Sequence, residues 1–350
     1  MKKPRKGTIS RKKLDIRTVA DRAGVSIATV SRTINAVPTV GPDLAQRVWK
    51  AIEELNYYPN TQARSLVSGH SRIFGLIVED ITNPFFPELI QGFEELAVES
   101  GYEILVSSTG NILGNLTTCV RRMLERKVEG VAVMTFGQEE PVLDDLVSRN
   151  IPLVLAEFRV DNPRISTILL DYQTGIQQAV DYLKSIGHRK IGFIAGPHTL
   201  HSANTRREAF LESLRQAGLP ADVTIILEGD HTLEGGVRAF ERLASSDAMP
   251  TALICSNDTT AIGVLRAAYH AGIRVPDDLS IIGLDDIHFA EFTLPPLTTI
   301  RLSRTELAKA AFTALRQMAE QEEGKKIERE FLVSTSLIIR GSTAPPRESI

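Results

Sequence analysis

The segment AGVSIATVSRTINAV, at residues 23–37, places short polar side chains and one arginine on a helical pattern. The hydroxyls of Thr29 and Ser31 and the amide of Asn35 are suited to hydrogen-bond phosphate oxygens. The guanidinium of Arg32 is suited to a bidentate contact with guanine. These residue types favour binding to a nucleic acid, although the segment could also belong to a protein-interaction module in which Arg32 is a solvated charge.

A second group of polar residues follows apolar runs farther along the chain: Asp80, Glu157, Asp230, Asn257 and Asp285. We expect them to converge on a cleft, because ligands bind outside the carboxyl ends of the strands in open parallel sheets. Carboxylates around a polar ligand suit paired hydroxyls such as those of sugars. Asn257 and Asp285 could instead cap the helices that follow them.

Three short helices are predicted to position the first group. A helix that starts near Arg17 buries one face, Gly24 allows a positive φ in the turn, and Ser26 stands where the N-cap of a second helix belongs. The predicted inward residues of these two helices are Val19, Ala20, Ala23, Val25, Val30 and Ile34. A third helix opens at Gly41 and Pro42, and its apolar residues at helical spacing are Leu44, Val48, Ile52 and Leu55. Two short helices about a glycine-containing turn, supported by a third, form a helix-turn-helix module.

The distribution of charge agrees with a nucleic-acid-binding head. Residues 1–70 contain 13 Lys or Arg and 5 Asp or Glu, a balance of +8, whereas the remaining residues carry a balance of −11. The first 14 residues hold seven of these cations and no acidic residue. We therefore expect residues 1–14 to be a disordered basic arm that is attracted to phosphates, the alternative being a tail that only aids solubility.

The stretches IRTVADRAGVSIATVSRTIN and AIEELNYYPNTQARSL are similar to the N-terminal signature of the LacI family of bacterial transcription regulators, and the resemblance extends through nearly the whole chain. It implies that residues 15–59 are the DNA-binding domain. The side chains that it implies at base edges are Ile27, Ala28 and Arg32, and those at the DNA backbone are Thr29, Ser31, Asn35, Tyr57 and Asn60. Ala28 is smaller than the residue of many relatives and suits contact with a thymine methyl group. Thr18 stands where the family often has Asp, and a threonine can still cap the first helix.

Residues 60–70 resemble the hinge of the same family. Asn60 can cap a helix of about two turns and Gly69 can end it, but so short a helix is marginal in water. The resemblance implies a hinge helix that folds against its dimer partner on operator DNA. In that arrangement Leu66 would wedge between bases in the minor groove, and Ala63 would allow close helix approach. A linker helix packed on the body is the alternative.

The body, residues 71–350, alternates apolar runs with helical patterns. Runs such as SRIFGLIVED, EGVAVMTF, TALICSND and LSIIGLDD suit parallel strands that are covered on both faces. They predict an α/β effector domain of two doubly wound parallel-sheet lobes, which resembles the periplasmic-binding-protein-like domain of the same family. We place the first lobe at about 71–170 and 301–330, and the second at about 171–300 and 331–343. A helix is expected from about Thr305 to Glu323, where the chain crosses back to the first lobe.

The resemblance also implies which residues contact the effector: Phe85, Glu157, Arg206, His231, Asn257 and Asp285. Met134 and Thr135 are further candidates for the lining. Glu157 is longer than the usual aspartate, and His231 stands where larger aromatic residues are frequent. We expect a small polar effector, a sugar or a sugar acid, and no cofactor and no metal site.

Other features exclude competing classes. Cys119 and Cys255 lack metal-ligand spacing and are expected to be buried. The sequence contains no apolar run of about 18 residues, the length that a membrane-spanning helix needs, and no signal peptide is evident. We therefore expect a cytoplasmic protein with no membrane partner. This disfavours a transport-type sugar-binding protein.

An enzyme is disfavoured because phosphate-binding glycine loops, nucleophile elbows and zinc-protease motifs are missing, and His188 and His270 lie near expected helix ends. The sequence thus predicts a homodimeric transcriptional repressor that binds pseudo-palindromic double-stranded operator DNA under allosteric control, with either an inducing or a co-repressing effector.

Overall fold

The computed structural model describes residues 15–35, 37–58, 70–110, 112, 114–135, 142–158, 160, 162–221, 224–246, 249–320 and 328–347. The chain forms two compact units, Met1–Ser71 and Arg72–Ile350. The predicted basic arm and the hinge residues Asn60, Ala63 and Leu66 lie outside the described residues. Within the described part, no helix is both long enough and apolar enough to span a membrane.

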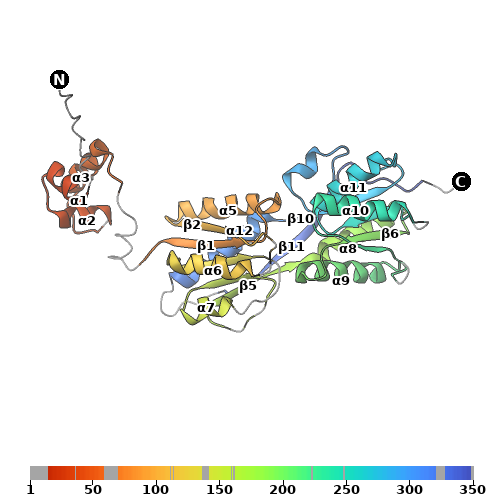
Figure 1. The fold of residues 1–350 in the computed structure, drawn as a ribbon, viewed down its shortest axis with the longest axis horizontal. Helices are drawn as coiled ribbons and strands as arrows, with labels where there is room; N and C mark the ends of the chain where they lie inside the picture. The colour runs from red at the N-terminus through yellow and green to blue at the C-terminus, as the bar shows by residue number, and fades with distance from the viewer. Residues whose placement is uncertain are drawn as a thin grey trace, which may run out of the picture. The chain divides into compact units, whose positions relative to one another are not determined.

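Three helices make up the described part of the first unit: α1 (Ile16–Ala23), α2 (Ile27–Ile34) and α3 (Pro42–Leu55) (Figure 1). Asp15 is the N-cap of α1 and accepts a hydrogen bond from the Thr18 backbone N–H at 3.0 Å. The expectation that Thr18 caps this helix is therefore wrong, because Thr18 lies within its first turn and its own hydroxyl donates to Asp15. Gly24 ends α1 with φ 63°, as the turn requires.

The head has a small apolar core to which all three helices contribute. Its buried members are Val19, Ala20, Ala23, Val30, Val48 and Ala51. Leu44 is 39% exposed, contrary to the spacing argument, because the buried residues of α3 begin only at Val48. Arg47 of α3 also stabilises the turn between α1 and α2, since its Nη2 atom donates hydrogen bonds to the carbonyls of Ala23 at 2.6 Å and Gly24 at 3.1 Å.

Eleven strands are found in the described part of the second unit, in the order β2-β1-β3-β4-β5-β11-β10-β9-β8-β6-β7. All neighbours are parallel except β10 and β11. The first lobe holds β1 (Ile73–Val78), β2 (Glu103–Ser108), β3 (Gly130–Met134), β4 (Leu153–Ala156) and β5 (Ile165–Asp171). The second holds β6 (Ile191–Ala195), β7 (Ile226–Glu228), β8 (Ala252–Cys255), β9 (Ser280–Asp285) and β10 (Thr298–Leu302), and β11 (Glu330–Ile338) belongs to both.

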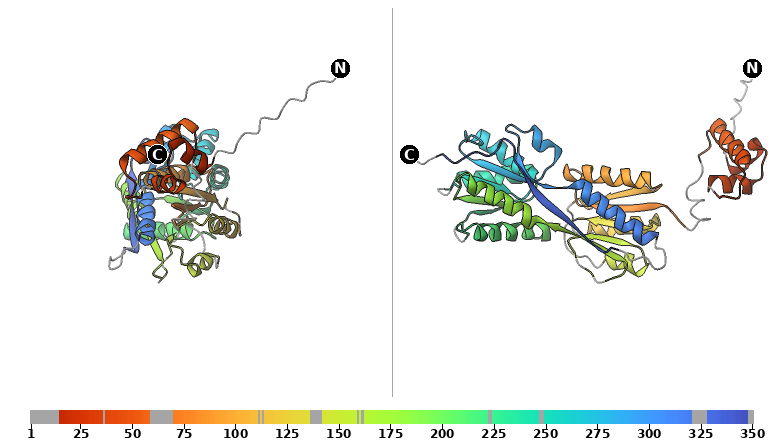
Figure 2. Two further views of the ribbon diagram at one scale, coloured as in Figure 1. Left: turned by 90° about the vertical axis from the view of Figure 1, so that its left-hand side faces the viewer. Right: turned by 180° about the vertical axis from the view of Figure 1, so that it is seen from behind.

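Helices cover both faces of each lobe (Figures 1 and 2). The first lobe has α5 (Phe85–Glu99), α6 (Asn115–Glu125), α7 (Leu143–Ser148) and α12 (Arg304–Ala319). The second has α8 (Tyr172–Ser185), α9 (His201–Gln216), α10 (Leu233–Ala244), α11 (Asp258–His270) and the short 3-10 helix η1 (His288–Phe292). Central strands such as β3, β8 and β9 are buried at every position, as expected of strands covered on both faces. The predicted class, a helical head and two doubly wound lobes, is confirmed.

The chain passes between the lobes three times. It crosses after β5 at Asp171, again between β10 and α12, and finally within β11, which runs through both lobes (Figure 2). The part of β11 up to Ser334 pairs with β5, and the part from Thr335 pairs with β10. The last crossing therefore falls in the middle of the strand, between Ser334 and Thr335, rather than near its start at the expected residue 331.

His188, which lies just after the C-terminal end of α8, is buried. Its two ring nitrogens lie 2.8 Å from Thr251 Oγ1 and 2.9 Å from the Ala344 carbonyl. The C-terminal segment thus covers this histidine, which has a structural role. Cys119 and Cys255 are both buried, as expected.

Candidate functional site

The first candidate site is the outer face of α2. Ser26 is its N-cap, as predicted, because the Ser26 hydroxyl accepts a hydrogen bond from the Thr29 backbone N–H at 3.1 Å. Ile27, Ala28 and Arg32 are exposed on this helix, while Val30 is fully buried beneath it. A helix that is anchored on one side and presents an arginine on the other can enter a major groove.

The predicted backbone contacts lie on the flanks of the same face. Thr29, Ser31 and Asn35 are half-buried, and Tyr57 packs at the edge of the head core, so each of these residues is partly accessible to solvent. Asn60 lies outside the described residues.

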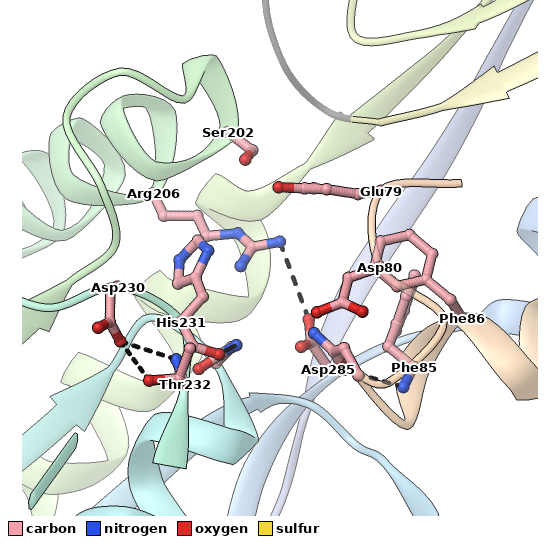
Figure 3. A pocket seen from close by; sticks show the side chains of 12 residues that line it. Glu79, Asp80, Phe85, Phe86, Ser202, Arg206, Asp230, His231, Thr232 and Asp285 are labelled. Carbon is pink, nitrogen blue, oxygen red and sulfur yellow. Dashed lines mark hydrogen bonds and ion pairs between the residues drawn. The ribbon is translucent and has the colours of Figure 1, made fainter. Parts of the chain in front are cut away.

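The second candidate site is a pocket in the second unit to which both lobes contribute (Figure 3). The first lobe supplies side chains that follow β1 or begin α5, and the second supplies residues from α9, from the segment between β7 and α10, and from the ends of β8 and β9. The lining residues are Glu79, Asp80, Asn83, Phe85, Phe86, Ser202, Arg206, Asp230, His231, Thr232, Asn257 and Asp285.

Arg206 is the central cation of this pocket and is only 5% exposed. Its Nη1 atom donates to the Ser256 carbonyl at 2.7 Å, and its Nη2 atom donates to the Tyr172 hydroxyl at 3.1 Å. The Asp285 carboxylate lies 3.8 Å from Nη2, close enough for attraction but too far for a direct hydrogen bond (Figure 3). The Nε atom of Arg206 is buried and has no hydrogen-bond partner.

Burial perturbs the acids around this arginine. It raises the pKa of Glu79 and of Glu157 to about 7, and that of Asp285 to about 6, although the charge of Arg206 opposes each shift. Burial works against the charged form of Arg206 too, but Tyr172, Asp285 and Glu157 together raise its pKa. The pocket therefore keeps one permanent cation beside acids that gain or lose protons near neutral pH.

His231 closes one end of the pocket in a strained conformation. Its φ is 63°, and its Nε2 atom lies 2.8 Å from the Ser256 hydroxyl. A Cβ atom on Gly196 would lie 1.9 Å from the same nitrogen, so the imidazole needs a glycine there. Burial, with the charge of Arg206, lowers the pKa of His231 to about 3, and the ring is neutral at physiological pH.

A link runs from the pocket to the first lobe through the end of β9. Asp285 and Asp286 have φ values of 116° and 56°, an unfavourable pair for residues other than glycine. Arg304 donates from Nη1 to the Asp285 carbonyl at 2.7 Å and pairs through Nε with Glu88 of α5 at 2.8 Å. Glu88 also accepts from the His288 backbone N–H at 3.1 Å, so it contacts both lobes.

The pocket gathers most of the residues expected to contact an effector. Phe85, Arg206, His231, Asn257 and Asp285 line it, as do Asp80 and Asp230 from the strand-end group. Glu157, Met134 and Thr135 are not among the lining residues, although the charge of Arg206 and the Tyr172 hydroxyl both act on the pKa of Glu157. Their roles in binding stay predictions.

Asn257 caps α11 through the Thr260 backbone N–H at 2.9 Å, as the alternative interpretation expected, and it also lines the pocket, while its contact with an effector stays a prediction. Asp285 ends β9 and faces Arg206 instead of capping a helix. Sequence reasoning missed Glu79 and Tyr172. The position of Glu79, next to the predicted strand-end Asp80, was the available signal.

Comparisons with known proteins match both units. A family model described as bacterial regulatory proteins, lacI family, matches residues 15–60, and one described as a periplasmic binding protein-like domain matches residues 180–343. The chain is similar to the HTH-type transcriptional repressor PurR of Pasteurella multocida, with 36% identity over 301 residues, which cover 86% of this chain and 90% of that protein.

Two solved structures have a similar fold. One is the Lac repressor dimer bound to operator and the anti-inducer ONPF, with a TM-score of 0.83, 26% identity and coverage of 95% of this chain and 100% of that one. The other is the complex of the transcriptional regulator CelR with cellobiose, with a TM-score of 0.70, 26% identity and coverage of 94% and 100%.

Proposed function

Because this chain belongs to the LacI family of bacterial regulatory proteins and is a DNA-binding transcriptional repressor, we propose that a small ligand controls its affinity for operator DNA. We propose further that this ligand is a neutral sugar or sugar derivative. The observation that carries the proposal is the pocket around Arg206, where both lobes contribute to the lining. A ligand that contacts both lobes can favour one of their relative orientations and so alter the spacing of two DNA-binding heads.

The charges of the pocket favour a neutral ligand. Among the described lining residues, Arg206 is the permanent cation, and the lining also holds the carboxyl groups of Glu79, Asp80 and Asp285 and that of Asp230, which pairs with Arg238 outside the lining. An added carboxylate would meet this excess of acidic groups, so a sugar fits better than a sugar acid. Hydroxyl groups can donate to the carboxylates and accept from Arg206 at the same time. The similar regulator CelR is described in complex with cellobiose, which supports the same class.

A homodimer on a pseudo-palindromic operator completes the proposal. Phe289, Phe292 and Leu294, in and just after η1, are 57%, 67% and 93% exposed, an arrangement that favours burial against a second copy of the chain. The similar Lac repressor is described as a dimer bound to operator. Each protomer would place Ile27, Ala28 and Arg32 at base edges, and the hinge residues Ala63 and Leu66 in the minor groove. Such a protein acts in the cytoplasm, where its operator is.

The Arg32 assignment is tested on an operator selected from a random DNA pool with the full-length chain. A palindromic consensus is expected of a homodimer. Arg32→Ala should lower the preference for this operator over unrelated DNA by about 5- to 150-fold, because a bidentate guanine contact contributes roughly 1–3 kcal/mol. The salt dependence of binding to unrelated DNA should change little. Unaltered discrimination would remove Arg32 from the base contacts.

The effector is tested on the same operator by fluorescence anisotropy with D-ribose, D-glucose, cellobiose and D-gluconate. We expect at least one neutral sugar to change operator affinity. Arg206→Ala should abolish that response and keep operator binding, whereas the matched control Arg215→Ala, an exposed arginine on the same helix, should respond normally. A response to gluconate alone, or a normal response of Arg206→Ala, would contradict the proposal.

A further inference from the structure

Tyr172 lies where the chain first passes from one lobe to the other. It is the first residue of α8 and follows Asp171, which ends β5 and caps α8 through the Thr174 backbone N–H at 3.0 Å. The Tyr172 side chain is 1% exposed. A tyrosine hydroxyl buried this deeply needs hydrogen-bond partners, because an unpaired polar group in the interior is costly.

Its two partners belong to different lobes. Arg206 of the second lobe donates to the Tyr172 hydroxyl at 3.1 Å, and the guanidinium carbon lies 4.6 Å from the ring centroid. Glu157, which follows β4 of the first lobe, lies near enough for the Tyr172 hydroxyl to lower the pKa of its carboxyl group. Tyr172 therefore accepts a hydrogen bond from a cation of one lobe and interacts electrostatically with a carboxyl group of the other.

This arrangement leaves two buried polar atoms without hydrogen-bond partners. They are Nε of Arg206, a donor, and Oε2 of Glu157, an acceptor. The two Nη atoms of Arg206 are already engaged, since one donates to the Ser256 carbonyl and the other to the Tyr172 hydroxyl. Tyr172 thus fixes the direction in which Arg206 presents itself to the pocket.

We infer that Tyr172 is a positioning residue that holds Arg206 for the effector and joins the two lobes through Glu157. The inference rests on the proposed function for the identity of the effector, but the hydrogen bond between Arg206 and Tyr172 exists in the free protein. Tyr172→Phe keeps the ring over Arg206 and removes only the hydroxyl. Tyr182→Phe is the matched control, because Tyr182 lies on the same helix and its hydroxyl forms a hydrogen bond with the hydroxyl of Thr343 at 3.0 Å, not with a charged group.

The pH dependence of stability separates positioning from packing. The pKa of Glu157 is raised from 4.5 to about 7 on folding, so its contribution to stability is fully present below about pH 4.5 and is lost as the pH rises through 7. The Tyr172 hydroxyl favours the charged carboxylate, and its removal raises this pKa further and deepens the loss at high pH. Arg206 of α9 and Glu79 after β1 also face Glu157, and Asp285 titrates in the same range.

The experiment measures Tm of the full-length chain at pH 5 and pH 8, at one protein concentration, for a double-mutant cycle of Tyr172→Phe and Glu157→Gln. The decrease in Tm caused by Tyr172→Phe should be larger at pH 8 than at pH 5 by at least about 2 °C. The difference should disappear in the Glu157→Gln background, where Glu79 and Asp285 still titrate. Tyr182→Phe should lower Tm equally at both pH values.

A decrease in Tm that is the same at both pH values, or a pH effect that survives in Glu157→Gln, would overturn the inference. Any sugar that binds the wild-type chain should bind Tyr172→Phe about tenfold or more weakly. Unchanged affinity would equally overturn the positioning of Arg206. If no sugar binds the wild-type chain, the proposed effector class fails, and the pH comparison still decides the role of Tyr172.

Discussion

Removal of the Arg47 side chain should destabilise the head more than its exposed position suggests. Arg47 donates to the carbonyls of Ala23 and Gly24, at the C-terminal end of α1, where the helix itself leaves carbonyl groups without partners. A hydrogen bond from a charged group contributes roughly 1.5–3 kcal/mol when buried. Because these bonds are only partly shielded from water, we expect Arg47→Ala to cost about 1–2 kcal/mol.

Arg22→Ala is the matched control, since Arg22 of α1 also contacts α3, through an ion pair with Glu54. Both side chains of this pair are well exposed, at 58% and 36%, and an exposed pair contributes at most about 1 kcal/mol. The two variants therefore remove one arginine each from the same pair of helices. They differ in whether the arginine holds the backbone of the turn or only another side chain.

The single tryptophan of the chain makes the measurement specific to the head. Trp49 lies on α3 and is half-exposed, so its fluorescence in the full-length protein reports unfolding of the head and not of the body. With a slope near 1 kcal/mol/M for so small a unit, Arg47→Ala should lower the urea midpoint by about 1–2 M. A decrease no larger than that of Arg22→Ala would refute the assignment of the Arg47 bonds.

Three further predictions concern the pocket, the dimer and the hinge. Gly196→Ala should weaken effector binding about tenfold or more in an anisotropy titration, because the new methyl group displaces His231 from Ser256. Operator binding without effector should persist. Unchanged effector affinity would contradict this geometry. Phe292→Asp should shift the chain toward monomer in sedimentation at micromolar concentration, and an unaltered dimer would exclude this surface. Leu66→Ala should weaken operator binding and reduce DNA bending in gel-shift assays, and normal bending would exclude the wedge.

The strands and the caps of the head were predictable because their signals are local. Near-continuous apolar runs gave the strands, and Ser26, Gly24 and the Gly41–Pro42 pair marked helix ends correctly. Leu44 shows the limit of spacing, which identifies one face of a helix but not how far along that face the neighbouring helices extend. The assignment of Thr18 as a cap failed for a related reason, since the true start of α1 depends on Asp15 one turn earlier.

The pocket was only partly predictable because it forms from segments that are distant in sequence. Asp80, Asn257 and Asp285 could be placed by the rule for strand ends. Tyr172 could not, because at the start of a helix it resembles any partly exposed tyrosine until the crossing of the two lobes encloses it. The burial of His188 likewise depends on the C-terminal segment that returns over it.

The path of β11 limits how such a gene can recombine. Because the chain crosses between the lobes three times, neither lobe corresponds to one continuous stretch of codons, and the residues from Arg304 onward supply parts of both. A single exchange between two related genes cannot transfer one lobe intact. The head, in contrast, is contiguous through Ser71, so one exchange near that residue moves a whole DNA-binding unit. New pairings of operator with effector are therefore expected to arise by shuffling at this boundary, whereas a new effector preference has to arise by substitution within the body.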